Sequence, residues 1–300
     1  MNNKISVVMG NYNCAAYIEE AINSLIAQTY KDWELIIVDD CSTDNSIEII
    51  EKYRDSRIRL ICSDSNQGLA VSLNKAISVA DGNLIARLDP DDISYPDRFQ
   101  KQVDFLLQKK EISVCGSNME LFGEVNGYVT KFPQESAGLM AYMPFNSPIP
   151  HSSWMINRVL FEDSLAYNPE FRSSQDYEFM YRLWKEKKLI ACIKEPLVKY
   201  RVRNDSISGK SRKRRDANTR KIQKCVLEDM GIDISDENID ELNLDFEKKK
   251  GRVDEYIKYL KINSLLLKHN KGDSFFSQSE LRKIIFKKSI VYGLEVIGLK

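Results

Sequence analysis

The chain has 300 residues, with 44 Lys and Arg against 44 Asp and Glu, so its formal net charge at pH 7 is zero. A balanced charge gives no support to nucleic-acid binding, and no stretch approaches the ~20 apolar residues of a membrane-spanning helix. The six cysteines form no C-x-x-C pair and are too sparse for a disulfide scaffold, which predicts reduced thiols and a cytoplasmic location. Strand-like residues 5–9 also leave no room for a signal peptide before them.

The first part of the chain alternates strand-like and helix-like segments with short connections. Short apolar runs predict the strands, and apolar residues three or four positions apart predict the helices between them. The predicted strands are 5–9, 35–38, 58–62, 84–88 and 113–117, and the predicted helices run through 17–26, 47–53, 69–80 and 99–107. This β-α-β order predicts an α/β, Rossmann-like domain with a mostly parallel, twisted sheet flanked by helices.

Regular patterns weaken in the middle of the chain and then return. Residues 118–175 are richer in Pro, Ser, Asn and Gly, which predicts loops and short strands that build a site. A helix is predicted at 177–184, followed by strands at 189–193 and 197–202. At residues 210–215 five of six side chains are cationic, and the chain beyond them has helical patterns.

This change in composition predicts two parts, an α/β domain at residues 1–208 and a helical C-terminal appendage at 209–300. The cationic run at 210–215 can be a solvated helix face, a nucleic-acid patch or a surface for anionic lipid. The amphipathic stretch that follows it favours contact with a membrane surface.

Two carboxylate clusters follow predicted buried strands directly. Asp39-Asp40 comes after strand 35–38, and Asp89-Pro90-Asp91-Asp92 comes after strand 84–88. Ligands in open α/β sheets lie outside the carboxyl ends of the strands. Three carboxylates within four residues repel one another unless a cation or amide donors compensate, which favours a divalent metal. A solvated turn is the alternative, because Asp and Pro are common turn formers.

The chain lacks the usual backbone cradles for phosphate. Residues 9–13 replace the G-x-G-x-x-G fingerprint after the first strand, and no Walker A sequence occurs. A metal held by Asp89 and Asp91 would therefore have to neutralise a diphosphate. This combination indicates a nucleotide diphosphate as the leaving group.

Five segments resemble the family 2 glycosyltransferases of GT-A fold, which are inverting, metal-dependent sugar transferases. The matching segments are 6–13, 33–44, 66–68, 88–92 and 175–178, in the family's order and within roughly residues 4–208. The chain departs from the family at Gly10, where Pro is frequent, and at Gln175, where Glu is common.

The resemblance implies a nucleotide site at the ends of the first two strands. Asp40 is expected to accept a hydrogen bond from N3 of uracil, or of thymine in a thymidine-linked donor. Asp39 is expected to support the turn or the ribose, or else to cap the helix after Ser42. Asn11 and Tyr12 are expected to lie at the nucleotide.

The resemblance also implies a loop and a metal site. Asn66 and Gly68 are expected to shape a loop against the nucleotide, or to form only a turn. Asp91 is the expected direct ligand of Mn²⁺ or Mg²⁺, with Asp89 nearer the ribose or a bound water. Asp92 is either a second ligand or, as we favour, a support for the turn.

The remaining expected site residues come from the later segments. Asp176 matches the family's general base, which takes the proton of the acceptor hydroxyl, and it can also cap the helix that follows. His151 can touch the diphosphate or the sugar, or be a structural histidine. Arg203 stands where the family often has His, in a closing segment whose basic residues can fold over the diphosphate.

The resemblance therefore predicts inverting transfer of a hexose from a UDP-sugar to a glycan or lipid-diphosphate-linked acceptor, such as an O-antigen, lipopolysaccharide or capsule intermediate. We expect no nucleic-acid partner and peripheral contact with the cytoplasmic face of the inner membrane. The rival functions are a sugar nucleotidyltransferase, which would want a Gly-rich basic loop at residues 10–13, and a non-catalytic sugar-binding scaffold. The sequence identifies neither the sugar nor the oligomeric state.

Overall fold

The computed structural model describes residues 3–162, 165–203, 217–235, 253–271 and 274–296, together with Ile239 and Leu242. The chain divides into two compact units. Unit 1 consists of the described residues within 1–134 and 149–214, and unit 2 of those within 135–148 and 215–300. The cationic run and the predicted domain boundary at 208 lie outside the described residues, so that boundary stays a prediction.

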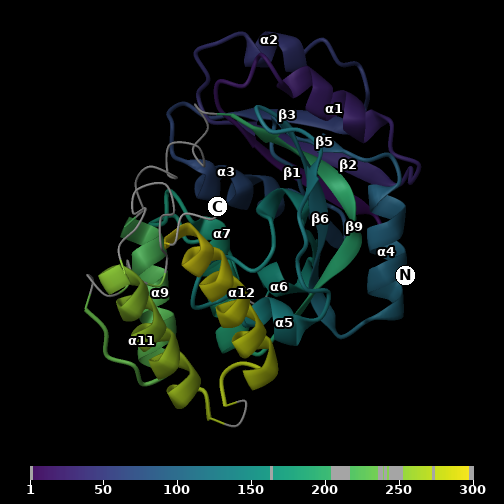
Figure 1. Ribbon diagram of the computed structural model, residues 1–300. Helices are drawn as coiled ribbons and strands as arrows, with labels where there is room; N and C mark the ends of the chain where they lie inside the picture. Colours follow the sequence, from purple (N-terminus) through teal and green to yellow (C-terminus); the bar gives the residue numbers. More distant parts are fainter. Residues whose placement is uncertain are drawn as a thin grey trace. The chain divides into compact units, whose positions relative to one another are not determined.

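Unit 1 alternates strands and helices through most of its length (Figure 1). Its elements are β1 (Ile5–Asn11), α1 (Ile18–Ile26), β2 (Trp33–Asp39), α2 (Ser46–Ile50), β3 (Ile58–Cys62), α3 (Leu69–Ser78), β4 (Leu84–Arg87), β5 (Ile93–Ser94), α4 (Arg98–Gln108), β6 (Ile112–Gly123), β7 (Tyr128–Val129), the 3-10 turn η1 (His151–Ser153), β8 (Met155–Asn157), α6 (Val159–Glu162), α7 (Gln175–Lys185) and β9 (Leu189–Val202).

The strands form one mixed sheet in the order β3-β2-β1-β4-β8-β6-β9-β5, with β7 paired to β6. The half from β3 to β4 is parallel, which confirms the predicted β-α-β arrangement. Strand β8 is antiparallel to both β4 and β6, whereas β9 is parallel to β6. The sheet therefore continues past the Rossmann-like half through one short inserted strand.

The register of the parallel half brings the two carboxylate clusters to one edge. Asn11 pairs with Asp39 across β1 and β2, and Val8 pairs with Arg87 across β1 and β4. Both clusters follow the carboxyl ends of strands that flank β1 directly. They therefore lie on either side of the residues that leave β1.

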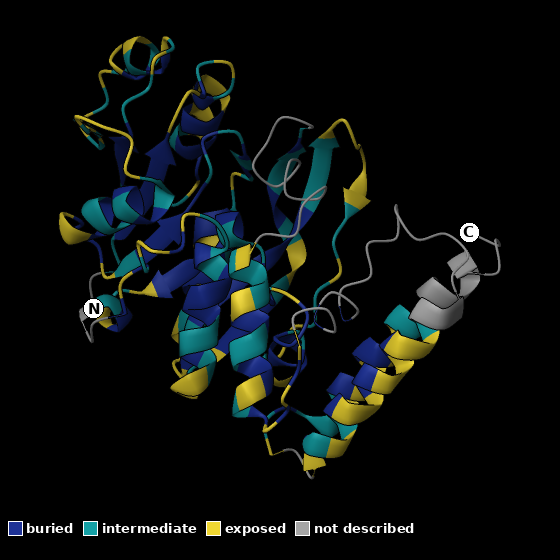
Figure 2. Ribbon diagram, turned by 90° about the vertical axis from the view of Figure 1, so that its left-hand side faces the viewer, coloured by how far each residue is buried: buried dark blue, intermediate teal, exposed yellow. Residues whose placement is uncertain are grey.

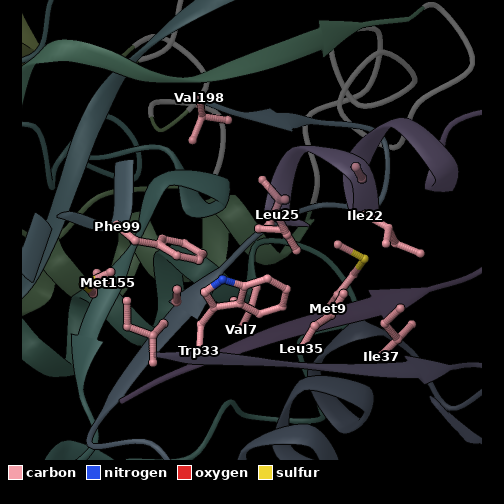
Figure 3. Close-up of a cluster of buried hydrophobic side chains, with 14 of the residues drawn as sticks. Val7, Met9, Ile22, Leu25, Trp33, Leu35, Ile37, Phe99, Met155 and Val198 are labelled. Carbon is pink, nitrogen blue, oxygen red and sulfur yellow. The ribbon is translucent and has the colours of Figure 1, made fainter. Parts of the chain in front are cut away.

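The core of unit 1 lies between the sheet and helices α1 and α4. Alternate residues of β1 and β2 point to this face and meet apolar side chains of both helices, as Figure 3 shows for Val7, Leu35, Leu25 and Phe99. All four side chains are fully buried. Burial of such a side chain stabilises the fold by about 1.5–3 kcal/mol, so this layer holds β1 and β2 firmly in place.

On the opposite face α3 packs against β1 at Gly10. A Cβ atom at Gly10 would lie 2.6 Å from Cδ1 of Leu69, the first residue of α3. The departure from the family's Pro at this position therefore coincides with a close approach of α3 to the strand.

Unit 2 is helical in the part of it that the structure describes. It contains α5 (Ser136–Met140), α9 (Ala217–Asp229), α11 (Val253–His269) and α12 (Gln278–Val296). Gln223 of α9 is buried and donates hydrogen bonds to the carbonyl oxygens of Pro144 and Phe145. Residues 135–148, which the sequence did not separate from the α/β domain, thus belong with the C-terminal helices. No helix in the described ranges is long and apolar enough to cross a membrane.

Candidate functional site

Asp39 holds the turn at the end of β2. Its carboxylate accepts hydrogen bonds from Asn11 Nδ2 at 2.6 Å, from the Ser42 backbone N–H at 2.8 Å and from Ser42 Oγ at 2.7 Å. Asp39 and Asn11 are both buried. These contacts agree with one of the roles expected for Asp39, which is to support the turn. The buried side chain of Asn11 also supports the turn, because it donates to Asp39.

Asp40 connects the end of β2 to the loop before α3. Its carboxylate accepts the backbone N–H groups of Gln67 at 2.9 Å and Gly68 at 2.7 Å. Gly68 has φ of 94°, a conformation that favours glycine. Only 4% of Asp40 is exposed. Each carboxylate oxygen keeps a further lone pair for a ligand donor, while Asn66 remains exposed on the loop.

Tyr12 lies between these anchored segments and is 48% exposed. Its neighbour Asn13 has φ of 53° and accepts the Thr43 backbone N–H at 2.8 Å, while the Asn13 N–H donates to Ser42 Oγ at 2.9 Å. The chain on both sides of Tyr12 is thus fixed to the turn after β2. The Tyr12 ring itself remains exposed.

Asp89 is paired with a buried arginine. Arg87 Nη2 lies 2.5 Å from Asp89 Oδ1, and Arg87 itself is fully buried at the end of β4. The Asp89 backbone N–H donates to Ser152 Oγ at 2.9 Å. These contacts orient the Asp89 carboxylate from both its own strand and the turn η1.

Asp91 is paired with Arg203, whose Nη2 lies 3.2 Å from Asp91 Oδ2. The two side chains are only 17% and 18% exposed. Burial and the negative charge of Asp89 together raise the pKa of Asp91 to about 6, against the opposing positive charge of Arg203. Asp89 and Asp91 therefore act on each other electrostatically, as two carboxylates facing a common ligand would.

Asp92 has a supporting position, as favoured from the sequence. It is fully buried, and its Oδ1 accepts the backbone N–H of Arg201 at 2.9 Å. Arg201 Nε in turn donates to the Asp91 carbonyl oxygen at 2.9 Å. Burial, with the charges of Asp89 and Asp91, raises the pKa of Asp92 well above its usual value. These contacts fasten β9, and with it Arg203, to the carboxylate turn.

No group of three or more His, Cys, Asp or Glu suited to a metal occurs among the residues that the structure describes. Carboxylate oxygens are the donors that hard divalent cations such as Mg²⁺ and Mn²⁺ prefer, and Asp89 and Asp91 would supply two of them.

Asp176 lies in the first turn of α7, after Ser174 with φ of 58°. Burial raises the pKa of the Tyr167 hydroxyl above its usual range, the positive charge of Arg87 lowers it, and the negative charges of Asp176 and Asp89 raise it.

His151 makes contacts of a structural kind. Its Nε2 lies 2.8 Å from the Tyr167 hydroxyl, and its ring meets Trp154 edge-on at 4.6 Å between centroids. Burial, together with the positive charge of Arg87, lowers the pKa of His151 well below 6.5. The neutral imidazole therefore helps to hold the Tyr167 hydroxyl in place.

Sequence reasoning missed Arg87 and Tyr167 as members of this site. A signal for Arg87 existed, because it is the only charged residue in the strand predicted at 84–88 and a buried charge requires a partner. Tyr167 lies in a region without periodicity, and nothing in the sequence distinguishes it among the 14 tyrosines of the chain.

Relatives of this chain are glycosyltransferases. Residues 6–165 match the family model described as Glycosyl transferase family 2. The chain is 37% identical over 216 residues to "Putative glycosyltransferase EpsE" of Bacillus subtilis (strain 168), covering 70% of this chain and 76% of that protein. It is also 37% identical over 128 residues to "UDP-Glc:alpha-D-GlcNAc-diphosphoundecaprenol beta-1,3-glucosyltransferase WfgD" of Escherichia coli, covering 43% and 50%.

Solved structures share the fold. The S. aureus TarS 1–349 complex with UDP-GlcNAc has a TM-score of 0.63 at 18% identity and covers 97% of this chain and 91% of that one. The mannosyltransferase PcManGT of Pyrobaculum calidifontis, in complex with GDP-Man and Mn²⁺, has a TM-score of 0.62 at 15% identity, covering 100% and 85%.

The solved structures show a GT-A fold, and the sequence relatives show that the protein is a glycosyltransferase. The chain belongs to glycosyl transferase family 2, as the matched residues 6–165 and the curated relatives show. The family and fold predicted from the five sequence segments are thereby confirmed.

Proposed function

We propose that this protein transfers a hexose from a UDP-sugar, with inversion, to a hydroxyl group of a sugar acceptor. The observation that carries the proposal is the pair of arginine-bound carboxylates, Asp89 with Arg87 and Asp91 with Arg203, at the sheet edge where Asp40 also lies. A base on α7 of the same unit would then complete a site for transfer between two bound sugars.

The uracil ring would lie between Tyr12 and Asp40. The exposed ring of Tyr12 offers a stacking surface, and Asp40 offers a carboxylate oxygen to the imide N–H. Gln67 and Gly68 hold that carboxylate in place through their backbone N–H groups. A thymidine diphosphate would satisfy the same contacts, so the measurement of donor preference includes both bases.

Asp91 and Asp89 would hold Mn²⁺ or Mg²⁺. The bound cation would supply positive charge to the departing diphosphate. Arg203 would contribute a second positive charge at the same place, because its guanidinium already lies beside Asp91. Asp92 and Arg201 keep both groups in position through β9.

Asp176 would act as the general base. It would take the proton of the acceptor hydroxyl while that oxygen forms a bond to the anomeric carbon. The bond from the anomeric carbon to the diphosphate breaks on the opposite face, the electron pair leaves with UDP, and the configuration inverts. Tyr167 is held in place by the His151 ring at its hydroxyl.

The acceptor that we propose is a growing bacterial surface polysaccharide, such as an O-antigen, lipopolysaccharide or capsule repeat, on a lipid diphosphate. Two relatives support this choice: WfgD, whose name includes diphosphoundecaprenol, and "Putative teichuronic acid biosynthesis glycosyltransferase TuaG" of Bacillus subtilis (strain 168), 32% identical over 208 residues and covering 68% of this chain and 81% of that protein. The enzyme would then work in the cytoplasm, peripherally at the inner face of the membrane.

Nucleotide release tests the proposal. The full chain is incubated with UDP-, dTDP- and GDP-sugars, a synthetic GlcNAc-diphosphate-lipid, and Mn²⁺, Mg²⁺ or EDTA. The expected result is UDP release from one donor, lost with EDTA and reduced at least about 100-fold in Asp91→Asn and Asp176→Asn. Asp104→Asn is the matched control, because Asp104 is exposed on α4. No nucleotide release from any donor, together with no nucleotide binding by calorimetry, would instead favour a non-catalytic scaffold.

A further inference from the structure

Among the positions of α11 and α12 whose exposure is described, the exposed residues are cations, apolar residues and two serines; Glu280, the acid among these positions, is half-buried and lies 2.6 Å from Lys283 Nζ. We call these exposed residues the hairpin surface. They are Ile257, Lys258, Leu260, Lys261, Ser264, Leu265 and Lys268 on α11, and Ser279, Arg282, Lys283, Phe286, Lys287 and Ile290 on α12. The whole chain has zero net charge, so this is a local concentration of positive charge.

The two helices have a separate buried side that holds them together. Tyr256 near the start of α11 donates to the carbonyl oxygen of Ser289 late in α12, which shows an antiparallel hairpin. Asn270 between them is buried and accepts the backbone N–H groups of Phe275 and Phe276. The apolar residues of the hairpin surface are therefore additional to those that build the hairpin (Figure 2).

The pattern is strongest on α12. Arg282, Phe286 and Ile290 are four residues apart, so they form one stripe along the helix. Phe286 is 67% exposed and Ile290 46% exposed. Lys283 and Lys287 lie beside this stripe, and both are exposed. Large apolar side chains on a solvated helix face, each next to cations, are typical of helices that lie in a membrane interface.

The chemistry of the surface distinguishes between possible partners. A nucleic acid would use the cations and leave Phe286 and Ile290 in water. A second copy of this surface would place cations against cations, and Glu280, the half-buried acid at its margin, already pairs with Lys283. An anionic phospholipid layer satisfies both components, with acyl chains for the apolar residues and phosphates for the lysines.

We propose that the hairpin surface binds anionic phospholipid membranes, with Phe286 and Ile290 entering the interfacial layer and the flanking cations next to lipid phosphates. The proposal extends the proposed function, because it names the surface that would bring the enzyme to a lipid-linked acceptor. It rests on the exposed residues of α11 and α12 alone and stands even where the sugar or acceptor proves different.

Vesicle co-sedimentation of the full chain tests this surface. Vesicles of phosphatidylcholine alone are compared with vesicles that also contain phosphatidylglycerol, at low and high salt. The expected result is binding only to the anionic vesicles, weakened by salt. Phe286→Ser with Ile290→Ser is expected to weaken binding at least about tenfold. Lys283→Glu with Lys287→Glu is expected to weaken it at least about fivefold for each cation removed.

Two matched controls place equivalent changes on unit 1. Val125→Ser with Tyr128→Ser removes exposed apolar side chains, and Lys110→Glu with Lys131→Glu reverses exposed charges. Both controls should bind as the unaltered protein does. Equal binding by the hairpin variants, weakened binding by the controls, or no binding to anionic vesicles would each overturn the proposal.

A water-soluble acceptor separates this proposal from the proposed function. Nucleotide release with such an acceptor should be unchanged in the hairpin variants, which also shows that they are folded. Loss of vesicle binding with full release supports the hairpin surface. Normal vesicle binding in a protein that releases no nucleotide would overturn the proposed function and leave the hairpin surface in place.

Discussion

At the scale of single residues, the two predicted metal ligands are each paired with an arginine. Arg87 contacts Asp89 from within β4, where it is fully buried and fixed by the strand. Arg203 contacts Asp91 from beyond the end of β9, and its guanidinium also lies 4.6 Å from the Tyr17 ring centroid. The Arg203 pair is thus the one that a side-chain rotation can open when a divalent cation arrives.

Arg203→Gln tests this competition. Removing a cation that lies 3.2 Å from a mostly buried carboxylate should strengthen binding of Mn²⁺ without nucleotide by about five- to tenfold. It should also weaken binding of UDP in the presence of Mn²⁺, because one positive charge near the diphosphate is lost. The measurement is the free Mn²⁺ signal in electron paramagnetic resonance, with and without UDP. Arg54→Gln, on an exposed arginine, should change neither value.

The neutral state of His151 predicts a pH dependence of stability. Because burial lowers its pKa well below 6.5 in the folded protein, the unfolded chain binds a proton first as pH falls. The contribution is therefore fully present above pH 6.5 and is lost as pH falls toward the folded pKa. The contribution of His151 to the free energy of unfolding should therefore fall as pH drops below 6.5, while the raised pKa of Asp91 acts in the opposite direction.

Urea unfolding followed by tryptophan fluorescence measures this effect, since Trp154 lies against the His151 ring. His151→Gln keeps a group that can bond the Tyr167 hydroxyl but does not titrate. The free energy of unfolding of this variant should therefore depend less on pH below 6.5. His269→Gln in unit 2 is the matched control and should follow the unaltered protein. Parallel pH curves for all three proteins would contradict the prediction.

At the scale of elements, the sequence predicted strands well where burial repeats in a parallel sheet. The runs that became β1 and β2 are almost entirely apolar because helices cover both faces of the sheet there. Residues 189–193 and 197–202 were predicted as two strands but form the single β9. The register against β6 shifts near Ser117 and Asn118, and this irregularity hides the continuity from a period-two pattern.

Other features of the elements depend on contacts that no local pattern encodes. Strand β8 is three residues long and owes its place to pairing with both β4 and β6. Asp40, Asp89, Asp91 and Asp176 were identified from motif resemblance, whereas their partners Arg87, Gln67 and Tyr167 became visible only through tertiary contacts. The acids of such a site can be predicted from motifs, but the groups that orient them cannot.

Two glycines next to strand β1 should respond differently to alanine. A Cβ at Gly82 would lie 2.6 Å from the Lys4 carbonyl oxygen and from the Ser6 backbone nitrogen, which are backbone atoms of the neighbouring strand segment. A Cβ at Gly10 would meet the mobile end of the Leu69 side chain instead. Gly82→Ala should therefore lower the free energy of unfolding by about 3 kcal/mol, and Gly10→Ala by about 1 kcal/mol or less.

Chemical denaturation of both variants, followed by tryptophan fluorescence, provides the comparison. All three tryptophans, Trp33, Trp154 and Trp184, belong to unit 1, so the signal reports on the unit that contains both glycines. Equal losses of unfolding free energy in the two variants, or a larger loss for Gly10→Ala, would contradict the prediction. Such a result would mean that the backbone next to Gly82 can shift to accommodate a Cβ atom.

At the scale of the whole molecule, the candidate site and the hairpin surface belong to different units. Every candidate site residue falls within unit 1, whereas the hairpin surface falls within unit 2. A ligand that binds only the folded site stabilises unit 1 by mass action, by about 2.7 kcal/mol at 100 times its dissociation constant. Unit 2 gains this stabilisation only to the extent that the two units unfold together.

UDP with Mn²⁺ should therefore raise the midpoint of the tryptophan fluorescence transition more than that of the helical signal in circular dichroism, to which α9, α11 and α12 of unit 2 contribute. Both midpoints are measured by thermal unfolding, with UDP alone, Mn²⁺ alone and both together. Asp91→Asn should lose the shift caused by the combination, because it removes an expected metal ligand. Equal shifts of both signals would mean that the units unfold as one cooperative body, and donor binding would then stabilise the membrane-facing hairpin as well.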